Sequence, residues 1–331
     1  MVQATAQDGG EFRPEIADVA VVIPAYNHSR FLAEAIESVL AQTLPVREII
    51  VVDDASVDET SVIAARHERV RLVRQPLNRG LSESRNLGMR LAGARWLLFL
   101  DADDRLLPHA VAHSVACMGK NPDAGFVYGA HRRVDAELRP ISGKLYHPLA
   151  AEPLCEFLQD NAVGMIATAL FDRAKLIEVG GFDPALPRCE DYDLFLRLAR
   201  RWPVACHDRL VAEYRIHGRN MSADAATMLQ VALEVLERHR PPRAEREERR
   251  AYRQGRRQWA SSYAHGAWRP RPGWPLRRLL SERLRMTMIA PGPSAFAAAA
   301  QFAKRVLPDR FVARLRPLLR HRLDIGSAES P

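Results

Sequence analysis

Aromatic residues and informative cysteines are both scarce in this sequence. Phe, Trp and Tyr make up only 7% of the residues, which argues against a module that stacks RNA bases on aromatic side chains. The four cysteines form no CxxC pair and no spacing typical of metal ligands, so we expect ordinary reduced thiols in a cytosol-like compartment. They are Cys117, Cys155, Cys189 and Cys206.

Long hydrophobic runs are also missing. No uninterrupted apolar stretch reaches the roughly 18–20 residues that a membrane span needs, and the nearest, AFAAAAQF at 295–302, is short and mostly Ala. The first 18 residues show no basic start followed by an apolar core, so we expect no signal peptide. The sequence therefore predicts a cytoplasmic protein that spans no membrane, although it leaves open a peripheral position at the inner membrane face.

The charges are divided unevenly along the 331 residues. The whole chain carries a net charge of +8. From residue 238 to the end there are 22 Arg/Lys and 7 Asp/Glu, whereas residues 1–237 hold 26 and 33. An acidic body suits a metal or donor site, and a basic tail suits an anionic surface. We therefore expect two parts with different partners.

Apolar runs alternate with amphipathic segments in the first hundred residues. Buried strands are expected at 19–24, 47–56, 71–76 and 95–104, and helices at 29–43, 58–69 and 81–94. This order predicts a mostly parallel sheet with helices on both faces. Further on, we expect a helix at 109–121, short strands and loop over 125–149, a strand and a helix within 165–182, a helix at 191–202 and a strand pair at 204–217. Four helical segments follow, at 226–239, 243–263, 276–288 and 294–320.

Polar clusters follow three of the expected strands. They are Pro24-Ala25-Tyr26-Asn27, Asp53-Asp54-Ala55-Ser56 and Asp101-Ala102-Asp103-Asp104. Ligands of parallel α/β sheets bind outside the carboxyl ends of the strands, so these clusters share one rim. Crowded carboxylates repel one another unless a cation compensates, and Mg²⁺ and Mn²⁺ prefer carboxylate oxygens. The rim thus favours a metal site over the alternative of a solvated Asp-rich turn.

Four segments carry a resemblance to a known family. VVIPAYNHSRFLAEAIESVLAQT, EIIVVDDAS, NRGLSESRNLGMRLAGARWLLFLDADD and GGFDPALPRCEDYDLFLRLA occur in this order and together resemble the family 2 glycosyltransferases. The similarity covers about residues 19–220. It implies the GT-A fold of nucleotide-diphospho-sugar transferases, which is a Rossmann-like, mostly parallel sheet, followed here by a basic helical extension.

The resemblance implies roles in donor binding. Pro24, Ala25 and Tyr26 would line the pocket for the nucleotide base, and Asp53 or Asp54 would accept a hydrogen bond from the base or ribose. Arg85 would approach the diphosphate or the donor ribose. Asp101 and Asp103 would form the Asp-x-Asp pair, one nearer the ribose and one on Mn²⁺ or Mg²⁺, with Asp104 as a further ligand.

The same resemblance implies an inverting single displacement. Glu190 and Asp191 match the family's Glu-Asp pair, with Asp191 as the base on the acceptor hydroxyl and Glu190 binding or orienting the acceptor. The alternative for this pair is plain N-capping of the helix that follows. His217 would be a metal ligand or diphosphate contact, and Arg215 and Arg219 would be weaker candidates for phosphate contacts. Gly180-Gly181 either permits close backbone approach near the acceptor or ends a helix.

The expected domains are contiguous. Residues 1–17 are a flexible N-terminus and 18–225 the transferase domain, with a nucleotide-sugar half at 18–104 and an acceptor half at 105–225. Residues 226–331 form the basic extension, where 301–323 interleaves apolar residues with Arg, as an interfacial helix on anionic lipid does.

We expect a glycosyltransferase that uses a nucleotide-diphospho-sugar and a glycan or lipid-linked acceptor, in cell-surface polysaccharide or glycolipid synthesis. A UDP-sugar is the first donor to test, with GDP- and dTDP-sugars left open. Three alternatives remain. A nucleotidyltransferase is disfavoured because PAYNHSR lacks Gly. A non-catalytic nucleotide-sugar-binding module would need less than the full acidic set. A nucleic-acid scaffold rests on the tail alone and is not expected.

Overall fold

The structure, a computed structural model, describes residues 16–150, 152–218 and 224–267. The chain divides into two compact units. Among the described residues, the first comprises those up to His147 together with Met165–Glu178 and Val204–Arg215, and the second comprises those of Pro148–Gly164, Val179–Pro203 and the described residues from Ile216 onward. The helices expected at 276–288 and 294–320, the segment 301–323 and Arg219 lie outside the described residues. The contiguous boundary expected after residue 225 stays a prediction.

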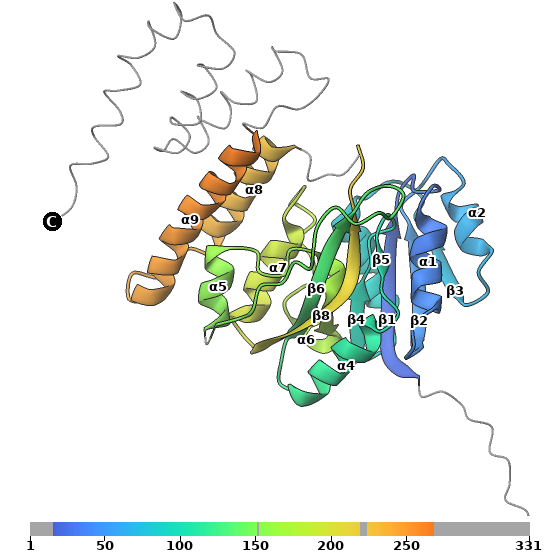
Figure 1. The fold of residues 1–331 in the computed structure, drawn as a ribbon, viewed down its shortest axis with the longest axis horizontal. Coiled ribbons are helices and arrows are strands. Elements are labelled where there is room, and N and C mark those ends of the chain that lie inside the picture. Colours follow the sequence, from blue (N-terminus) through green and yellow to red (C-terminus); the bar gives the residue numbers. More distant parts are fainter. Residues whose placement is uncertain (1–15, 151, 219–223, 268–331) are drawn as a thin grey trace, which may run out of the picture. The chain divides into compact units, whose positions relative to one another are not determined.

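The first unit contains one eight-stranded sheet, shown in Figure 1. Its strand order is β3-β2-β1-β4-β7-β6-β8-β5. The strands are β1 (Ala17–Ala25), β2 (Val46–Asp53), β3 (Val70–Arg74), β4 (Trp96–Phe99), β5 (Arg105–Leu106), β6 (Phe126–Val134), β7 (Ala169–Asp172) and β8 (Val204–Arg215).

Strands β1 to β4 form the parallel part that the apolar runs predict. β1 lies between β2 and β4, with Ile23 opposite Val51 and Val22 opposite Phe99, and β3 pairs with the other edge of β2. The buried stretches 19–23 of β1, 49–52 of β2 and 96–99 of β4 are continuous apolar runs, because both faces of a parallel sheet are covered. The predicted parallel sheet is therefore confirmed for this half.

Helices cover both faces of the parallel part. The helices of the first unit are α1 (Leu32–Leu40), α2 (Thr60–Ala65), α3 (Leu81–Leu91), α4 (Ala110–Lys120) and α6 (Arg173–Glu178), with a 3₁₀ turn at Ile166–Thr168. The buried residues of α1 and α4 share a core with alternate residues of β1 such as Val21 and Ile23. On the opposite face α3 lies so close to β1 that a Cβ on Gly88 would meet Cγ1 of Val22 at 2.3 Å. Glycine thus permits the tight packing of α3 on the sheet.

The later strands differ from the prediction in two places. Residues 204–217 do not form a strand pair but contain the single strand β8, and 125–149 contains the nine-residue strand β6 rather than only short strands. β8 pairs in parallel with β6, but the register slips between Cys206, opposite Tyr128, and Leu210, opposite Ala130. The polar residues between Cys206 and Leu210 form this irregularity, which in sequence resembles a turn.

The second unit contains helices only, among its described residues. They are α5 (Pro153–Gln159), α7 (Glu190–Ala199), α8 (Ala225–Arg238) and α9 (Arg246–Ala267). α8 begins after Asp224, whose side chain accepts a hydrogen bond from the backbone N–H of Thr227, and Figure 1 shows α9 running beside it. The helices predicted at 226–239 and 243–263 are thus confirmed to within a few residues. No helix in the described part of the chain is both long and apolar enough to cross a membrane.

Candidate functional site

The carboxyl ends of β1, β2 and β4 lie at one edge of the sheet, as predicted. Ala25 pairs with Asp53 at the ends of β1 and β2, and the backbone N–H of Leu100, just past β4, donates to the carbonyl of Val22. Parallel strands run in the same direction, so their carboxyl ends lie at the same edge of the sheet. The three polar clusters that follow these strands therefore gather at this edge. We call this edge, with residues 24–27, 53–56 and 101–104, the acidic rim.

Two loops of the acidic rim are fastened to each other by hydrogen bonds. The backbone N–H of Asn27 donates to Oγ of Ser56 at 2.9 Å, and Oδ1 of Asn27 accepts from the N–H of Val57 at 2.9 Å. The N–H of His28 donates to Oγ1 of Thr60 at 3.0 Å. Asn27 adopts a left-handed backbone (φ 55), which Asn tolerates better than most residues. The loop that carries Tyr26 is therefore held rigidly.

Asp58 is a residue of this loop pair that the sequence analysis missed. Its Oδ2 accepts from the backbone N–H of Ser29 at 3.0 Å, and its Oδ1 accepts from the N–H of Thr60 at 3.0 Å. Burial raises its pKa, but the hydrogen bonds from Thr60 and Ser29 outweigh this and lower the pKa to about 2. Asp58 therefore stays ionised and stabilises the loop at every physiological pH. Its sequence context, Ser-Val-Asp-Glu-Thr, indicates only a turn.

The three residues predicted for the base pocket differ in exposure. Pro24 and Ala25 are buried within β1, whereas the side chain of Tyr26 is 44% exposed. Only Tyr26 therefore presents its side chain at the rim, and Pro24 and Ala25 contribute shape and backbone atoms. Their role in base binding stays a prediction.

Asp53 and Asp54 are both buried and already accept hydrogen bonds within the chain. Asp53 accepts from the backbone N–H of Ser56 at 2.9 Å and from the hydroxyl of Ser61, with Nε of Arg74 at 3.5 Å. These contacts hold the loop after β2.

Asp54 organises the start of α3. Its Oδ1 accepts from Nε2 of Gln75 at 2.7 Å and from the N–H of Arg79 at 2.8 Å, and its Oδ2 accepts from the N–H of Gly80 at 2.8 Å. Gly80 has φ 87, a conformation that favours glycine. Asp54 thereby shapes the entry to the helix that carries Arg85.

Arg85 meets Asp101 at the rim. An Nη2 of Arg85 lies 2.6 Å from Oδ1 of Asp101, and the arginine side chain is only 2% exposed while the aspartate is 30% exposed. The structure thus brings together two residues that the sequence separates by a helix and a strand. The buried guanidinium of Arg85 orients the carboxylate of Asp101 and supplies positive charge where we expect the diphosphate of the donor.

Asp103 and Asp104 have different surroundings. Oδ2 of Asp103 lies 3.9 Å from Nε2 of His28, a residue that the sequence analysis did not select. Asp104 is buried; its Oδ1 accepts from the backbone N–H of Arg215 at 2.8 Å, and its Oδ2 has no hydrogen-bond partner among the described residues. Burial, followed by the charges of Asp103 and Asp101, raises the pKa of Asp104 well above its ordinary value.

Arg215 links Asp104 to α1. Its side chain is 1% exposed, an Nη2 lies 2.7 Å from Oε2 of Glu34, and the guanidinium stacks over the ring of Phe31 at 4.5 Å. An Nη1 also donates to the carbonyl of Ala136 at 3.1 Å. Arg215 is therefore engaged inside the first unit, and its role as a phosphate contact stays a prediction.

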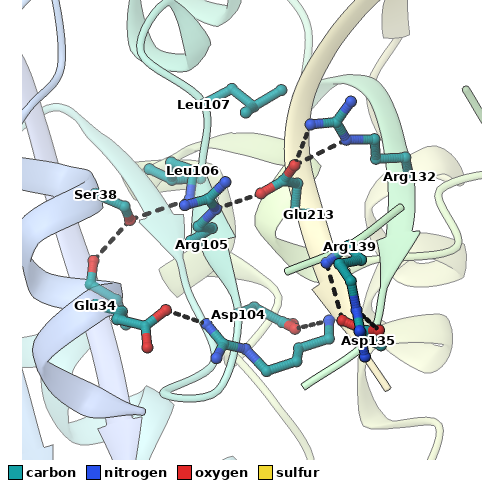
Figure 2. A network of polar contacts seen from close by, with 12 residues as sticks. Glu34, Ser38, Asp104, Arg105, Leu106, Leu107, Arg132, Asp135, Arg139 and Glu213 are labelled. Carbon is teal, nitrogen blue, oxygen red and sulfur yellow. Dashed lines mark hydrogen bonds and ion pairs between the residues drawn. The ribbon is translucent and has the colours of Figure 1, made fainter. Parts of the chain in front are cut away.

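Glu213 is the centre of a second buried ion cluster. Its side chain is 0% exposed and accepts from Nε of Arg105 and, at 2.8 Å, from Nε of Arg132. Arg105 of β5 stands directly opposite Glu213 of β8 in the sheet, and Figure 2 shows the carboxylate between the two guanidinium groups. The cluster fastens β5, which follows Asp104 directly, to β8. Charged residues within a strand pattern were the only signal for it in the sequence.

The acidic rim fits a divalent cation that its ligand helps to hold. Among the described residues no three His, Cys, Asp or Glu side chains converge closely enough to bind a metal by themselves. Mg²⁺ and Mn²⁺ are commonly held by one or two carboxylates together with phosphate oxygens of the ligand. Oδ2 of Asp104 has no hydrogen-bond partner among the described residues, and burial together with the charges of Asp103 and Asp101 raises the pKa of this group, so its ionised form is disfavoured unless a cation lies close by. Asp101 and Asp103 therefore fit the metal as partial ligands.

Glu190 and Asp191 open helix α7 in the second unit. The cap residue is Cys189, with φ 56 and no capping side-chain hydrogen bond, and Glu190 and Asp191 form the first turn. Neither acid is the cap residue itself, but both lie in the first turn, where carboxylates stabilise a helix N-terminus, so this alternative stays open beside the catalytic one. Glu190 is buried and Asp191 half-buried, and Oδ1 of Asp191 accepts from the N–H of Tyr192 at 2.7 Å. A left-handed backbone at a residue other than glycine is strained, and such strain often occurs at functional sites.

Helix α7 is anchored from its inner side. The hydroxyl of Tyr192 donates to the carbonyl of Phe157 in α5 at 2.7 Å, and its ring packs on Trp259 of α9 at 5.1 Å. Asp193 accepts from Nε of Arg197 at 2.7 Å and contacts Nε2 of His239 at 2.9 Å. These contacts fix the orientation of the two acids at the start of the helix.

His217 and the glycine pair also lie in the second unit. His217 follows β8 and is half-buried, and its role as a ligand stays a prediction. Gly180 and Gly181 have φ 85 and φ 70 and begin two residues after the end of α6. Positive φ at two successive residues is typical of glycines that end a helix. The structure therefore favours the helix-stop interpretation for this pair.

Comparison of the sequence with known proteins identifies one family. Residues 20–180 match the model of "Glycosyl transferase family 2". An uncharacterized glycosyltransferase of Haemophilus influenzae is 29% identical over 182 residues, which cover 54% of this chain and 61% of that protein. The chondroitin synthase of Escherichia coli is 30% identical over 209 residues, or 62% of this chain and 30% of that protein. The chain thus spans less than two thirds of the length of these relatives.

Solved structures show the fold. TarS 1-349 of S. aureus has a TM-score of 0.60 and 16% identity, covering 92% of this chain and 86% of that one; it has also been solved with UDP and with UDP-GlcNAc. The mannosyltransferase PcManGT of Pyrobaculum calidifontis, in complex with GDP-Man and Mn2+, has a TM-score of 0.59 and 19% identity, covering 94% and 87%. The expected GT-A fold is confirmed. By the family match and the similarity to its relatives, residues 20–180 of the chain form a family 2 glycosyltransferase domain, and the fold is of the GT-A type.

Proposed function

We propose that this protein is an inverting glycosyltransferase that moves a sugar from a nucleotide-diphospho-sugar to an acceptor hydroxyl. The observation that carries the proposal is the acidic rim, where Arg85 pairs with Asp101 beside Asp103 and Asp104. A buried guanidinium next to clustered carboxylates provides both a cation for phosphate and ligands for a metal. Family membership and the GT-A fold support the same activity.

The proposed donor is a UDP-sugar held with Mn²⁺ or Mg²⁺. Support comes from two proteins of the same fold, one solved with UDP-GlcNAc and the other with GDP-Man and Mn2+. Tyr26 would stack or pack beside the base, and Asp101 and Asp103 would hold the metal and the ribose, with Asp104 and His217 as further ligand candidates. When bound, such a metal neutralises charge that develops on the departing nucleoside diphosphate. Asp53 and Asp54 would act mainly through the loops that they hold.

The proposed base is Asp191. A general base needs a carboxylate held in a fixed orientation, and α7 is anchored through Tyr192, Phe157 and Trp259. Asp191 would take the proton of the acceptor hydroxyl while the bond between the sugar and the phosphate breaks, so the anomeric configuration inverts. Glu190, next to it, would orient the acceptor.

The proposed acceptor is a glycan or a lipid-linked sugar in cell-surface polysaccharide or glycolipid synthesis. The support for this acceptor is the similarity of this chain to a chondroitin synthase, and that similarity covers 30% of the synthase. An anionic membrane surface, contacted through 226–331, is the further partner that we propose.

Calorimetric titration of the purified protein with UDP, GDP and dTDP tests the donor site. Each nucleotide is titrated with Mn²⁺ and again with EDTA, on the wild type, on Asp103→Ala and on Asp123→Ala. Asp123 is an exposed aspartate away from the rim and serves as the matched control. We expect metal-dependent binding of UDP that is lost in Asp103→Ala and retained in Asp123→Ala.

The outcomes separate the alternatives. No binding of any nucleotide by the folded wild type contradicts the proposal. Binding without release of nucleoside diphosphate, with any sugar donor and acceptor mixture, would favour a non-catalytic module. Pyrophosphate release from a nucleoside triphosphate and a sugar phosphate would identify a nucleotidyltransferase.

A further inference from the structure

Helix α9 has one face that is buried in the second unit. Ala251, Tyr252, Gly255 and Trp259 are buried on this face. At Gly255 the helix approaches α5 so closely that a Cβ would lie 2.0 Å from the carbonyl oxygen of Leu158. Tight backbone packing of this kind fixes which face of α9 points outward.

The opposite face of α9 carries a row of arginines, which we call the arginine stripe. It consists of Arg246, Arg250, Arg253 and Arg257, and all four side chains are exposed. Their spacing of four, three and four residues places them within about 60° of the helix circumference and along about 16 Å of its axis. Gly255 falls on the far side of the helix from this row, so the stripe is directed away from the packed face.

The stripe differs from the other arginines of α9, which have partners within the unit. Arg249 donates to the carbonyl of Pro241 at 2.9 Å, and Arg256 lies 3.2 Å from Oε2 of Glu237. The side chains of the four stripe arginines make no ion pair or hydrogen bond with the described part of the chain. Their charge is therefore not used to hold the fold.

Acidic residues near α9 do not neutralise the stripe. Glu247 and Glu248 lie in the first turn, where carboxylates favour the helix N-terminus, and Glu248 pairs with Arg200 at 3.2 Å. After this turn the described side chains of α9 include no Asp or Glu. The stripe is thus a linear, solvent-exposed patch with a charge of about +4.

We propose that the arginine stripe binds the phosphate headgroups of an anionic lipid surface. A straight row within a narrow sector of a helix can touch a plane with all four side chains at once. Guanidinium groups bind phosphate oxygens in a bidentate manner, and anionic membranes attract clustered basic residues. This refines the proposed membrane partner and uses no residue of the transfer chemistry.

Two observations favour lipid over nucleic acid as the occupant. Proteins that bind single strands stack bases on aromatic side chains, but Tyr252 and Trp259 of α9 are on its buried face. The sequence that continues after α9, residues 268–331, carries 13 Arg/Lys and 4 Asp/Glu and interleaves them with apolar residues at 301–323. That composition is typical of segments at a membrane surface.

Vesicle flotation with the full chain tests the proposal. The quadruple variant R246Q/R250Q/R253Q/R257Q is compared with the wild type and with R66Q/R95Q/R133Q/R209Q, which removes the same charge from exposed arginines of the first unit. Vesicles of phosphatidylcholine with phosphatidylglycerol are used beside vesicles of phosphatidylcholine alone. Circular dichroism confirms that both variants fold.

We expect the wild type and the control variant to float with the anionic vesicles only. Each arginine near such a surface contributes about fivefold to affinity, so the stripe variant should bind several hundredfold more weakly. Equal losses in both variants would show that only net charge matters and would overturn the proposal. Unchanged vesicle binding by the stripe variant would also overturn the proposal. The same holds if the stripe variant loses only binding to single-stranded nucleic acid. UDP titration of the same variants keeps this result separate from the donor site, because the stripe variant should bind UDP as the wild type does.

Discussion

Replacing Glu213 by alanine tests whether burial gives the ion cluster between β5 and β8 its strength. Glu213 is 0% exposed and pairs with Arg105 and Arg132. Glu137 offers a matched control, because it also pairs with two arginines, Arg30 at 3.9 Å and Arg139 at 3.1 Å, but is 59% exposed. The two substitutions remove the same side chain and the same number of partners, so they differ mainly in solvent access.

The expected magnitudes follow from the exposure of the partners. Breaking a buried ion pair by removing one member costs about 3–5 kcal/mol, since the remaining charge is left uncompensated. Arg105 and Arg132 are 33% and 32% exposed, so water can reach them and the cost falls to the lower end. We expect Glu213→Ala to cost about 3 kcal/mol of local stability, and Glu137→Ala about 0.5 kcal/mol or less, as for other surface pairs.

Amide hydrogen exchange is the suitable assay because the chain contains two units and need not unfold in one step. A loss of about 3 kcal/mol corresponds to roughly a hundredfold faster exchange in peptides that cover β5 and β8. The same variant should also bind nucleotide more weakly, since β5 follows Asp104 directly. Equal effects of Glu213→Ala and Glu137→Ala, or exchange that stays unchanged in both, would refute the reasoning that burial makes this cluster strong.

The remaining predictions concern the base, the packing of α9 and a buried histidine. Asp191→Asn should leave UDP binding within about twofold but lower kcat by about 10²–10⁴, measured as UDP release, because general-base catalysis contributes that much; a normal kcat would exclude this residue as the base. Gly255→Ala should lower the melting temperature, because its Cβ would lie 2.0 Å from the carbonyl oxygen of Leu158 and overpacking costs about 1–3 kcal/mol, whereas Gly119→Ala, with nothing within 4 Å, should be neutral or stabilising. Burial, helped by the charge of Arg133, lowers the pKa of His131 to about 4. The fold therefore favours neutral histidine, and stability present above the unfolded value of about 6.5 is lost as pH falls towards 4, by up to about 1.4 kcal/mol per pH unit. Urea titrations at several pH values give the free energy of unfolding as a function of pH. This free energy should fall less steeply with decreasing pH in His131→Asn than in the wild type, and an equally steep fall would show that other groups cause the loss.

Much of the parallel half of the fold was readable in the sequence. A run such as 19–24 or 96–100 is apolar throughout because helices cover both faces of the strand, and this makes the run visible without its partners. The chain then leaves each strand at the same edge, so the position of the acidic rim follows from connectivity alone. The gathering of residues 24–27, 53–56 and 101–104 at this edge is a consequence of that rule.

The later strands show where local reading is insufficient. β8 was divided in two because polar residues interrupt its apolar pattern, yet pairing along β6 carries the strand across the irregularity. Glu213 and Arg215 lie in this strand as charges that no local pattern explains, because their partners Arg105, Arg132 and Glu34 are far away in the chain. Buried charges are stable only when paired, and the pairs form only after the strands have assembled.

The sequence by itself determined the family, the parallel strands of the first half and the acids at the rim, since these depend on short apolar runs and on residues close together in the chain. Only the tertiary structure decided which of those acids accept hydrogen bonds from loops, that Arg85 faces Asp101, and that Cys189 rather than an acid precedes α7. The arginines of α9 are visible in the sequence as a spacing of four and three. Their meaning depends on the opposite face, because a helix turns one side to solvent only once another side has found a partner to pack against.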